Sequence, residues 1–241
     1  MASATQIAIA GAGSIGCYVG GCLALEGRKV SFLARPRVAE ALRQGGLHLT
    51  DLDGLDRTIA PAQIPAGADP ATQLAGAGVV LVTVKSGATA EMADTIARHA
   101  PSDAIVVSLQ NGTGNVAVLR ERLGAGRVVV PGMVPFNVIQ SHDANGALHV
   151  HRATSGTILI GTSPGGTLAA LLDVPHARTA GHADMDAIQW GKLLLNLNNA
   201  LNALSGIPLA AQLADPAWRR LLAGQMQEAL DGFSAAGIRA I

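Results

Sequence analysis

Short apolar runs separated by mixed segments occupy the first two thirds of the chain. The runs at residues 6–10, 29–34, 79–83 and 104–108 are apolar and partly β-branched, as is typical of buried strands. A helix of small residues is expected directly after the first run, and further helices are expected at 38–44, 88–99 and 115–123. Strands that alternate with helices in this way indicate an α/β protein.

Two hairpins are also predicted. Residues 46–59 alternate in polarity and contain a turn signal at Asp53 and Gly54. Residues 147–153 and 156–160 alternate as a second hairpin, which would extend the sheet at an edge. The other segments are predicted as a loop with one short helical turn at 61–78, a strand at 128–130, and a loop or strand at 132–138.

From about Asp184 the pattern changes to long stretches rich in Leu and Ala. Gly206 to Pro208 and the pair Asp215-Pro216 interrupt these stretches. Helices are therefore expected at 184–204, 209–215 and 217–236. The change predicts two domains, one over residues 1–180 and a helical one over residues 184–241.

A glycine-rich turn lies between the first strand and the first helix. Gly11 allows the turn, Gly13 allows the backbone to approach a pyrophosphate, and Gly16 allows the helix to pack closely on the sheet. The phosphates would lie at the positive end of that helix. The expected cofactor contacts are Gly11, Ala12, Gly13, Ser14, Ile15 and Gly16. A turn without a ligand is the alternative in a chain with 29 glycines. The position of the motif favours an α/β Rossmann-type dinucleotide-binding domain followed by an all-helical second domain.

Arg35 follows the second predicted strand, where dinucleotide-binding folds distinguish their cofactors. An acidic residue here would bind the ribose 2′-hydroxyl of NAD, whereas an arginine accommodates the 2′-phosphate of NADP. This position has Arg35 and Arg37 on either side of Pro36, and no acid. We therefore expect NADP(H). An ordinary solvated arginine on a loop is the alternative.

The composition argues against several other classes of protein. Seventeen basic residues balance seventeen acidic ones, so no net field attracts nucleic acid or an anionic membrane. No Lys or Arg precedes Arg28, so the charged region of a signal peptide is missing. No uninterrupted apolar run is long enough to span a bilayer. A cytoplasmic protein is expected.

Neither the cysteines nor the histidines predict a redox or metal site. Cys17 and Cys22 lie about 140° apart on the first helix, which disfavours a disulfide between them. We expect buried thiols in a reducing compartment, with redox chemistry as the alternative. His149 and His151 point to one side of a strand, but no third ligand is near in the sequence. We expect exposed edge-strand histidines and no metal.

Lys192 lies on a helix whose leucines cover most other directions. Asn196 lies about 40° from Lys192 around the helix, and Asn199 about 20° on the other side, so the three side chains form one stripe. The leucine pattern predicts that little of this helix is exposed to water. A buried lysine is costly unless it has partners or a catalytic purpose. The alternative is a lysine whose amine reaches solvent beside asparagines that bridge helices.

Four motifs occur in the order and approximate spacing of a known family: Gly11-Ala-Gly-Ser-Ile-Gly16, Val82-Thr-Val-Lys85, Gln110-Asn-Gly112 and Trp190-Gly-Lys-Leu-Leu-Leu-Asn196. Over essentially its whole length, the sequence resembles the ketopantoate reductase (2-dehydropantoate 2-reductase) family. The resemblance implies that NADPH reduces ketopantoate to pantoate on the pathway to pantothenate, the precursor of coenzyme A.

The resemblance also implies roles for individual residues. Lys192 matches the catalytic lysine that donates a proton to the keto oxygen, and Asn196 matches a substrate-binding asparagine. Asn111 and Lys85 match residues at the nicotinamide end of the cofactor, and Val138 matches a position that lines the cofactor with backbone. The substrate is expected to lie between the two domains.

The sequence departs from the family pattern in its helical part. A second asparagine of the catalytic helix falls at Ala200 by counting, one residue from Asn199, which stays a substrate-binding candidate. A further asparagine falls near Leu209 or Ala210, and a family segment with a Ser and a Glu would follow Ile241. A shortened family member and an incomplete chain both fit this pattern. The alternatives for function are a reductase of another small 2-keto acid and an NADP-binding protein without turnover. The Leu-rich helices favour a homodimer.

Overall fold

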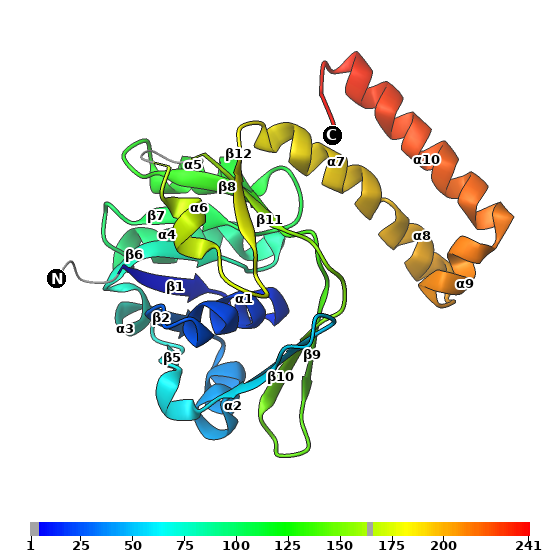
Figure 1. Cartoon of the computed structure of the whole chain (residues 1–241). Coiled ribbons are helices and arrows are strands. Elements are labelled where there is room, and N and C mark those ends of the chain that lie inside the picture. Colours follow the sequence, from blue (N-terminus) through cyan, green and yellow to red (C-terminus); the bar gives the residue numbers. More distant parts are fainter. Residues whose placement is uncertain (1–4, 163–165) are drawn as a thin grey trace. The chain divides into compact units, whose positions relative to one another are not determined.

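The computed structural model describes residues 5–162 and 166–241 and shows two compact units (Figure 1). The first unit comprises Met1–Gln110 and Gly114–Ala183, and the second comprises Asn111–Thr113 and Asp184–Ile241. The first unit contains two β-sheets with helices, and the second is helical.

The central sheet of the first unit has the strand order β12-β11-β8-β7-β6-β1-β2-β5. Its strands are β1 (Gln6–Ala10), β2 (Val30–Leu33), β5 (Ala66–Gly67), β6 (Ala77–Val82), β7 (Ile105–Ser108), β8 (Val129–Met133), β11 (Ile158–Gly161) and β12 (Thr179–His182). The strands from β5 to β8 are parallel, and β11 pairs antiparallel with β8. The strand order reverses at β1, because β2 lies on one side of it and β6 on the other. Open α/β sheets bind ligands at such a switch point, outside the carboxyl ends of the strands.

The helices described in this unit are α1 (Ser14–Leu25), α2 (Pro36–Gly45), α3 (Pro70–Leu74), α4 (Thr89–His99), α5 (Asn115–Leu123) and α6 (Leu168–Leu172), with the 3₁₀ turns η1 (Pro61–Gln63) and η2 (Ser86–Ala88). Alternate residues of β1 face two separate cores, one with α1 and one with α4 and α5. Ile7 and Ile9 pack with Tyr18 of α1, whereas Ala8 and Ala10 face the other core. Each large aliphatic side chain buried in this way stabilises the fold by about 1.5–3 kcal/mol. The predicted fold class, an α/β domain followed by a helical one, is confirmed.

A second sheet in the first unit has the order β4-β3-β10-β9. Its strands are β3 (Leu47–Asp51), β4 (Asp56–Ile59), β9 (Val138–His142) and β10 (Leu148–Arg152). The predicted hairpin over 46–59 is confirmed, and Gly54 in its turn has a φ of 92°. The predicted pairing of 147–153 with 156–160 is wrong. β10 pairs instead with β3 and β9, and β11 joins the central sheet. The carboxylate of Asp143 accepts two backbone N–H bonds in the β9–β10 turn and so favours that hairpin.

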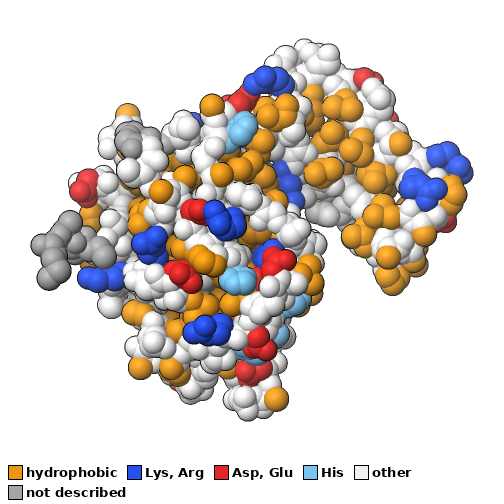
Figure 2. All heavy atoms as spheres, in the orientation of Figure 1, with side chains coloured by type: hydrophobic (Ala, Val, Ile, Leu, Met, Phe, Trp, Pro, Cys, Tyr) orange, Lys and Arg blue, Asp and Glu red, His pale blue; other side chains and the backbone are white. Residues whose placement is uncertain are grey.

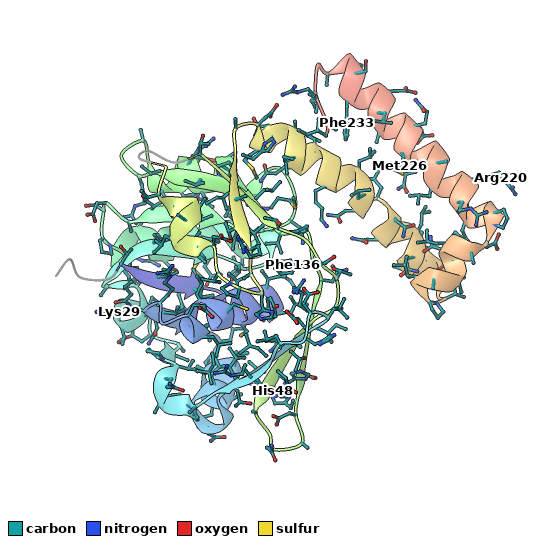
Figure 3. The ribbon with its side chains drawn as sticks, viewed as in Figure 1. Lys29, His48, Phe136, Arg220, Met226 and Phe233 are labelled. Atoms are coloured by element: carbon teal, nitrogen blue, oxygen red, sulfur yellow. The ribbon has the colours of Figure 1, made fainter. Side chains whose placement is uncertain are left out.

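The histidines of β10 are not on an exposed edge, because β10 is an inner strand of this sheet. His149 and His151 are half-buried, and the Thr50 hydroxyl lies 2.8 Å from a ring nitrogen of each. His48 of β3, labelled in Figure 3, stacks on His149 with ring centroids 4.6 Å apart. Within the described residues, no group of three or more potential ligands is arranged to hold a metal ion.

The second unit contains α7 (Met185–Asn196), α8 (Asn198–Ser205), α9 (Leu209–Ala214) and α10 (Pro216–Ala235). The single helix predicted over 184–204 is interrupted at Leu197, whose N–H approaches the carbonyls of both Leu193 and Leu194. Leu197 keeps helical backbone angles, so the interruption is local. Asparagines on both sides of it compete for backbone hydrogen bonds and have low helix propensity.

The expectation that little of the helix around Lys192 is exposed to water is confirmed only in part, because four of its five predicted covering leucines are half-buried but Leu204 is exposed. Leu195 is 65% exposed and Leu204 is 81% exposed. Figure 2 shows hydrophobic side chains gathered over α7 to α10 on the face in view. Trp190 packs edge-on against Phe233, which lies with Met226 on the side of α10 that faces α7 and α8 (Figure 3). No helix among the described residues is both long and apolar enough to cross a bilayer.

Candidate functional site

A cleft of about 540 Å³ opens in the first unit at the ends of β1, β2 and β6. Its walls come from the glycine-rich turn after β1, from the start of α2, from the segment after β6 and from α4. The lining residues are Gly11, Ala12, Gly13, Leu33, Ala34, Arg35, Pro36, Val38, Ala68, Pro70, Thr83, Val84, Lys85, Ala88, Glu91, Met92, Thr95 and Gln140. The cleft therefore lies at the switch point of the sheet, where the glycine motif predicts a dinucleotide.

The three motif glycines meet different surroundings. Gly11 has a φ of 112°, which other residues rarely adopt, and a Cβ there would lie 2.7 Å from a methyl group of Val84. A Cβ on Gly16 would collide with the carbonyl oxygen of Gly11. A Cβ on Gly13 would meet nothing within 4 Å, because Gly13 borders the cleft. Gly11 and Gly16 are thus required by the fold, and Gly13 keeps space open for a ligand.

The turn also presents the start of a helix to the cleft. Gly11 and Ala12 donate their N–H groups to the carbonyl of Leu33, at 3.1 and 3.2 Å. Gly13 precedes α1, and no side chain caps this end of the helix. Ser14 and Ile15 form its first turn and are half-buried. A helix N-terminus without a side-chain cap binds phosphate well, because its N–H groups and dipole both favour an anion.

Two basic residues lie at the cleft. Arg35 is exposed and precedes α2 directly, with Pro36 at the first helical position. Lys85 is exposed and follows β6, at the start of η2. No acidic residue occupies the end of β2, so the positive charge at this end of the cleft suits a 2′-phosphate.

Several lining residues were not singled out from the sequence. Glu91, Met92 and Thr95 belong to α4, and Gln140 belongs to β9 of the second sheet. The helical spacing of positions 91, 92 and 95 places them on one side of α4, a signal that the sequence did contain. The position of Gln140 depends on the pairing of β9 with β10, which the sequence did not predict.

Five predicted cofactor residues are not among the residues that line the described cleft: Ser14, Ile15 and Gly16 of the first turn of α1, and Asn111 and Val138 elsewhere. Asn111 is exposed and is grouped with the second unit, and Val138 begins β9 opposite Arg152. Gln110, just before Asn111, is buried and donates from its amide to the carbonyl of Val84 at 2.9 Å. The chain entering the Asn111 turn is therefore anchored to the end of β6.

The predicted catalytic and substrate residues lie in the second unit. Lys192 is half-buried on α7, and burial lowers the pKa of its amine. Asn196 is the last residue of α7, whereas Asn199 is exposed on α8. Leu197 separates these two asparagines onto two helices, but its backbone angles stay helical, so α8 continues directly from α7.

The two cysteines are unsuited to redox chemistry. Cys17 and Cys22 are free and buried in α1, and burial raises the pKa of each thiol to about 12. A small cavity of about 100 Å³ beside Cys22 and His176 has room for only a few water molecules. The prediction of buried thiols is confirmed.

Comparisons with known proteins agree with this geometry. The family model described as "Ketopantoate reductase PanE/ApbA" matches residues 7–165, and the model of the C-terminal part of the same family matches residues 184–241. A 2-dehydropantoate 2-reductase of Halobacterium salinarum is 30% identical over 97% of this chain and 76% of its own length. A PanE/ApbA family ketopantoate reductase from Ralstonia eutropha JMP134 has a similar structure, with a TM-score of 0.84 and 29% identity over 98% of this chain and 76% of that one.

A more distant structure shows the same fold. A D-mandelate dehydrogenase, solved with NADH and anilino(oxo)acetate, aligns with a TM-score of 0.82 at 18% identity. The alignment covers 98% of this chain and 76% of that one. At this identity the likeness concerns the fold alone.

Proposed function

The chain belongs to the ketopantoate reductase family, and we propose that it uses NADPH to reduce ketopantoate to pantoate in pantothenate biosynthesis, in the cytoplasm. The observation that carries the proposal is the cleft at the ends of β1, β2 and β6, with an open Gly13 and an uncapped helix start. Its chemistry suits a dinucleotide, because backbone N–H groups can bind the pyrophosphate. Arg35 at the end of β2 favours the cofactor that carries a 2′-phosphate.

When bound, NADPH supplies the hydride that reduces the ketone. Lys192 is proposed to supply the proton: its ammonium group polarises the keto oxygen, stabilises the negative charge that develops there and then donates a proton to it. Burial on α7 supports this role, because it lowers the pKa of the amine and so makes the ammonium a stronger acid. A lysine at full solvent exposure would hold its proton more tightly at neutral pH.

The other predicted site residues receive roles from the family resemblance. Asn196 and Asn199 are proposed to bind the substrate through their amides. Asn111 and Lys85 are proposed to contact the nicotinamide end of the cofactor, and the backbone of Val138 to line it. Support for these positions is the match of motifs, together with the location of Lys85 at the cleft.

One assay tests the proposal. The oxidation of NADPH by the full chain is followed with ketopantoate and with several other 2-keto acids at equal concentration. Fastest turnover with ketopantoate supports the proposed reaction, whereas faster turnover with another acid makes the chain a reductase of that acid. Tight binding of NADPH without any turnover would identify an NADP-binding protein that lacks reductase activity.

A further inference from the structure

Thr83 connects the end of β6 to the glycine-rich turn. It is the first residue after β6, is half-buried and lines the cleft. Its N–H donates to the carbonyl of Ala10 at 3.0 Å, which extends the pairing of β6 with β1 up to the turn. Its hydroxyl donates to the carbonyl of Gly11, with an Oγ1–O distance of 2.5 Å.

The Gly11 carbonyl is the central acceptor of the turn. It accepts the N–H of Gly13 at 2.8 Å as well as the hydroxyl of Thr83. The N–H groups of Gly11 and Ala12 are held by the carbonyl of Leu33. Because a peptide group is planar, a fixed Gly11 carbonyl also fixes the plane of the peptide bond to Ala12. The backbone that leads into α1 is therefore oriented by Thr83 at the Gly11 carbonyl and by Leu33 at the N–H groups of Gly11 and Ala12.

The same hydroxyl lies at the start of α1. A Cβ added to Gly16 would lie 2.6 Å from Oγ1 of Thr83 and would also collide with the Gly11 carbonyl. Thr83, Gly11 and Gly16 thus meet at one closely packed junction between the turn, the helix and β6. A change in the direction of the Gly11 carbonyl would move the backbone that leads into the first turn of α1, which begins at Ser14.

We propose that Thr83 is a positioning residue for dinucleotide binding, acting through its hydrogen bond to the Gly11 carbonyl. The role presupposes the dinucleotide site proposed above. Because Thr83 acts on the turn and not on the ribose, it orients the part of the site that binds the pyrophosphate. That group is common to NADPH and NADH, so both cofactors depend on Thr83 equally.

The test compares substitutions that separate the hydroxyl from the methyl group. Thr83→Ala removes both, Thr83→Ser keeps the hydroxyl, and Thr83→Val keeps the branched shape without a donor. Dissociation constants of NADPH and NADH are measured by fluorescence titration of the full chain without substrate. Only folded protein binds the cofactor, so the dissociation constant from the titration refers to the folded fraction. Thermal unfolding of each variant checks the fold.

Thr83→Ala and Thr83→Val are expected to raise both dissociation constants by a common factor of about 3- to 10-fold, the equivalent of one hydrogen bond. Thr83→Ser is expected to restore both constants to within about twofold of the original values. In steady-state assays the KM for NADPH should rise in Thr83→Ala while kcat changes little.

Three results would overturn the role of Thr83. These are unchanged dissociation constants in Thr83→Ala, an effect confined to NADPH, and a Thr83→Ser variant as weak as Thr83→Ala. Binding of NADPH by the unaltered chain without reduction of any 2-keto acid would overturn the proposed reaction but leave the role of Thr83 standing. No binding of either dinucleotide would overturn both.

Discussion

Arg152 and Asp51 form a buried ion pair inside the first unit. Nη2 of Arg152 lies 2.9 Å from Oδ2 of Asp51, and their side chains are 4% and 0% exposed. The hydroxyl of Tyr18 lies 2.9 Å from Nε of Arg152 and 3.1 Å from Asp51. Because Arg152 lies on β10, Asp51 on β3 and Tyr18 on α1, the pair joins the second sheet to the first helix.

Loss of the Asp51 charge should strongly destabilise this unit. Asp51→Asn leaves the buried guanidinium of Arg152 with only the exposed Asp53 as an ionic partner, and breaking a buried pair from one side costs about 3–5 kcal/mol. Urea unfolding measures the change in the free energy of unfolding. Asp103→Asn, at an exposed aspartate, is the matched control and should change it by less than about 0.5 kcal/mol. Equal stability of the two variants would show that the pair contributes little.

The pH dependence of stability checks the same pair. Burial raises the pKa of Asp51, but hydrogen bonds from Arg152 and from backbone N–H groups outweigh it and lower the pKa below its ordinary value. The stabilisation is therefore present above the unfolded-state pKa of about 3.9 and is lost as the pH falls below it. Asp51→Asn should lose less stability than the original chain over this acidic range.

A second prediction about the pH dependence of stability concerns His149, in a less acidic range than that of Asp51. Burial, and then the nearby His48 and His151, lower the pKa of His149, against the opposite effect of Asp143 and Asp56. The folded state thus binds fewer protons than the unfolded state, and stability falls as the pH drops through the unfolded value of about 6.5.

Replacement of this histidine removes that titration. His149→Gln should reduce the stability lost between neutral pH and the low pKa of the folded state, as measured by urea unfolding across the range. The exposed His142 on β9 provides the control, His142→Gln. An unchanged pH profile in His149→Gln would exclude His149 as the responsible group.

How much of the structure could be predicted from the sequence depends on how far apart in the sequence the interacting residues lie. The parallel strands and the glycine turn were predicted because each depends on neighbours in the chain. The pairing of Leu47 with Leu148 joins strands that are distant in sequence and leave no local signal, so β10 was assigned the wrong partner.

The same distinction applies to the residues of the candidate site. Gly11, Gly13, Arg35 and Lys85 were predicted from positions at strand ends, and all of them line the cleft. Gln140 reaches the cleft through the second sheet and could not be predicted from its own neighbourhood. The break at Leu197 is decided by a balance between similar helical hydrogen bonds, which periodicity alone does not resolve.

Removal of the Lys192 amine should separate catalysis from cofactor binding. Lys192→Ala is expected to leave the dissociation constant of NADPH unchanged and to lower kcat by about 10²- to 10⁴-fold, the usual contribution of a positioned acid. In the original enzyme the rate should fall as the pH rises through the pKa of Lys192, which burial lowers. Single-turnover kinetics with ketopantoate measure the loss of rate and its dependence on pH. A variant with the original rate would remove Lys192 from the mechanism.

Arg35 should determine the choice between the two cofactors. Arg35→Ala is expected to weaken NADPH by about 10-fold or more, because a charge-assisted hydrogen bond contributes about 1.5–3 kcal/mol, and to leave NADH nearly unchanged. Arg43→Ala is the control, since Arg43 is exposed on α2, the helix that Arg35 precedes, and pairs with Glu40. Fluorescence titration gives all the constants. An equal loss for both cofactors would contradict the assignment of NADP.

Alanine at Gly13 should weaken cofactor binding without harming the fold, whereas alanine at Gly16 should destabilise the fold. Gly13 has a φ of −84°, which alanine adopts easily, and an added Cβ would meet nothing within 4 Å. Gly13→Ala should therefore fold with nearly the original stability, but its methyl group would occupy space that the pyrophosphate needs, so both NADPH and NADH should bind at least about 10-fold more weakly.

Gly16→Ala would force a methyl group against the Gly11 carbonyl and the Thr83 hydroxyl. It should destabilise the fold by about 1–3 kcal/mol, the usual cost of overpacking, whether or not a dinucleotide is present. Thermal unfolding and cofactor titration of the two variants give the comparison. Normal dinucleotide binding by a stably folded Gly13→Ala variant would show that the phosphates do not approach the backbone at this turn, because the added methyl group would then border no ligand.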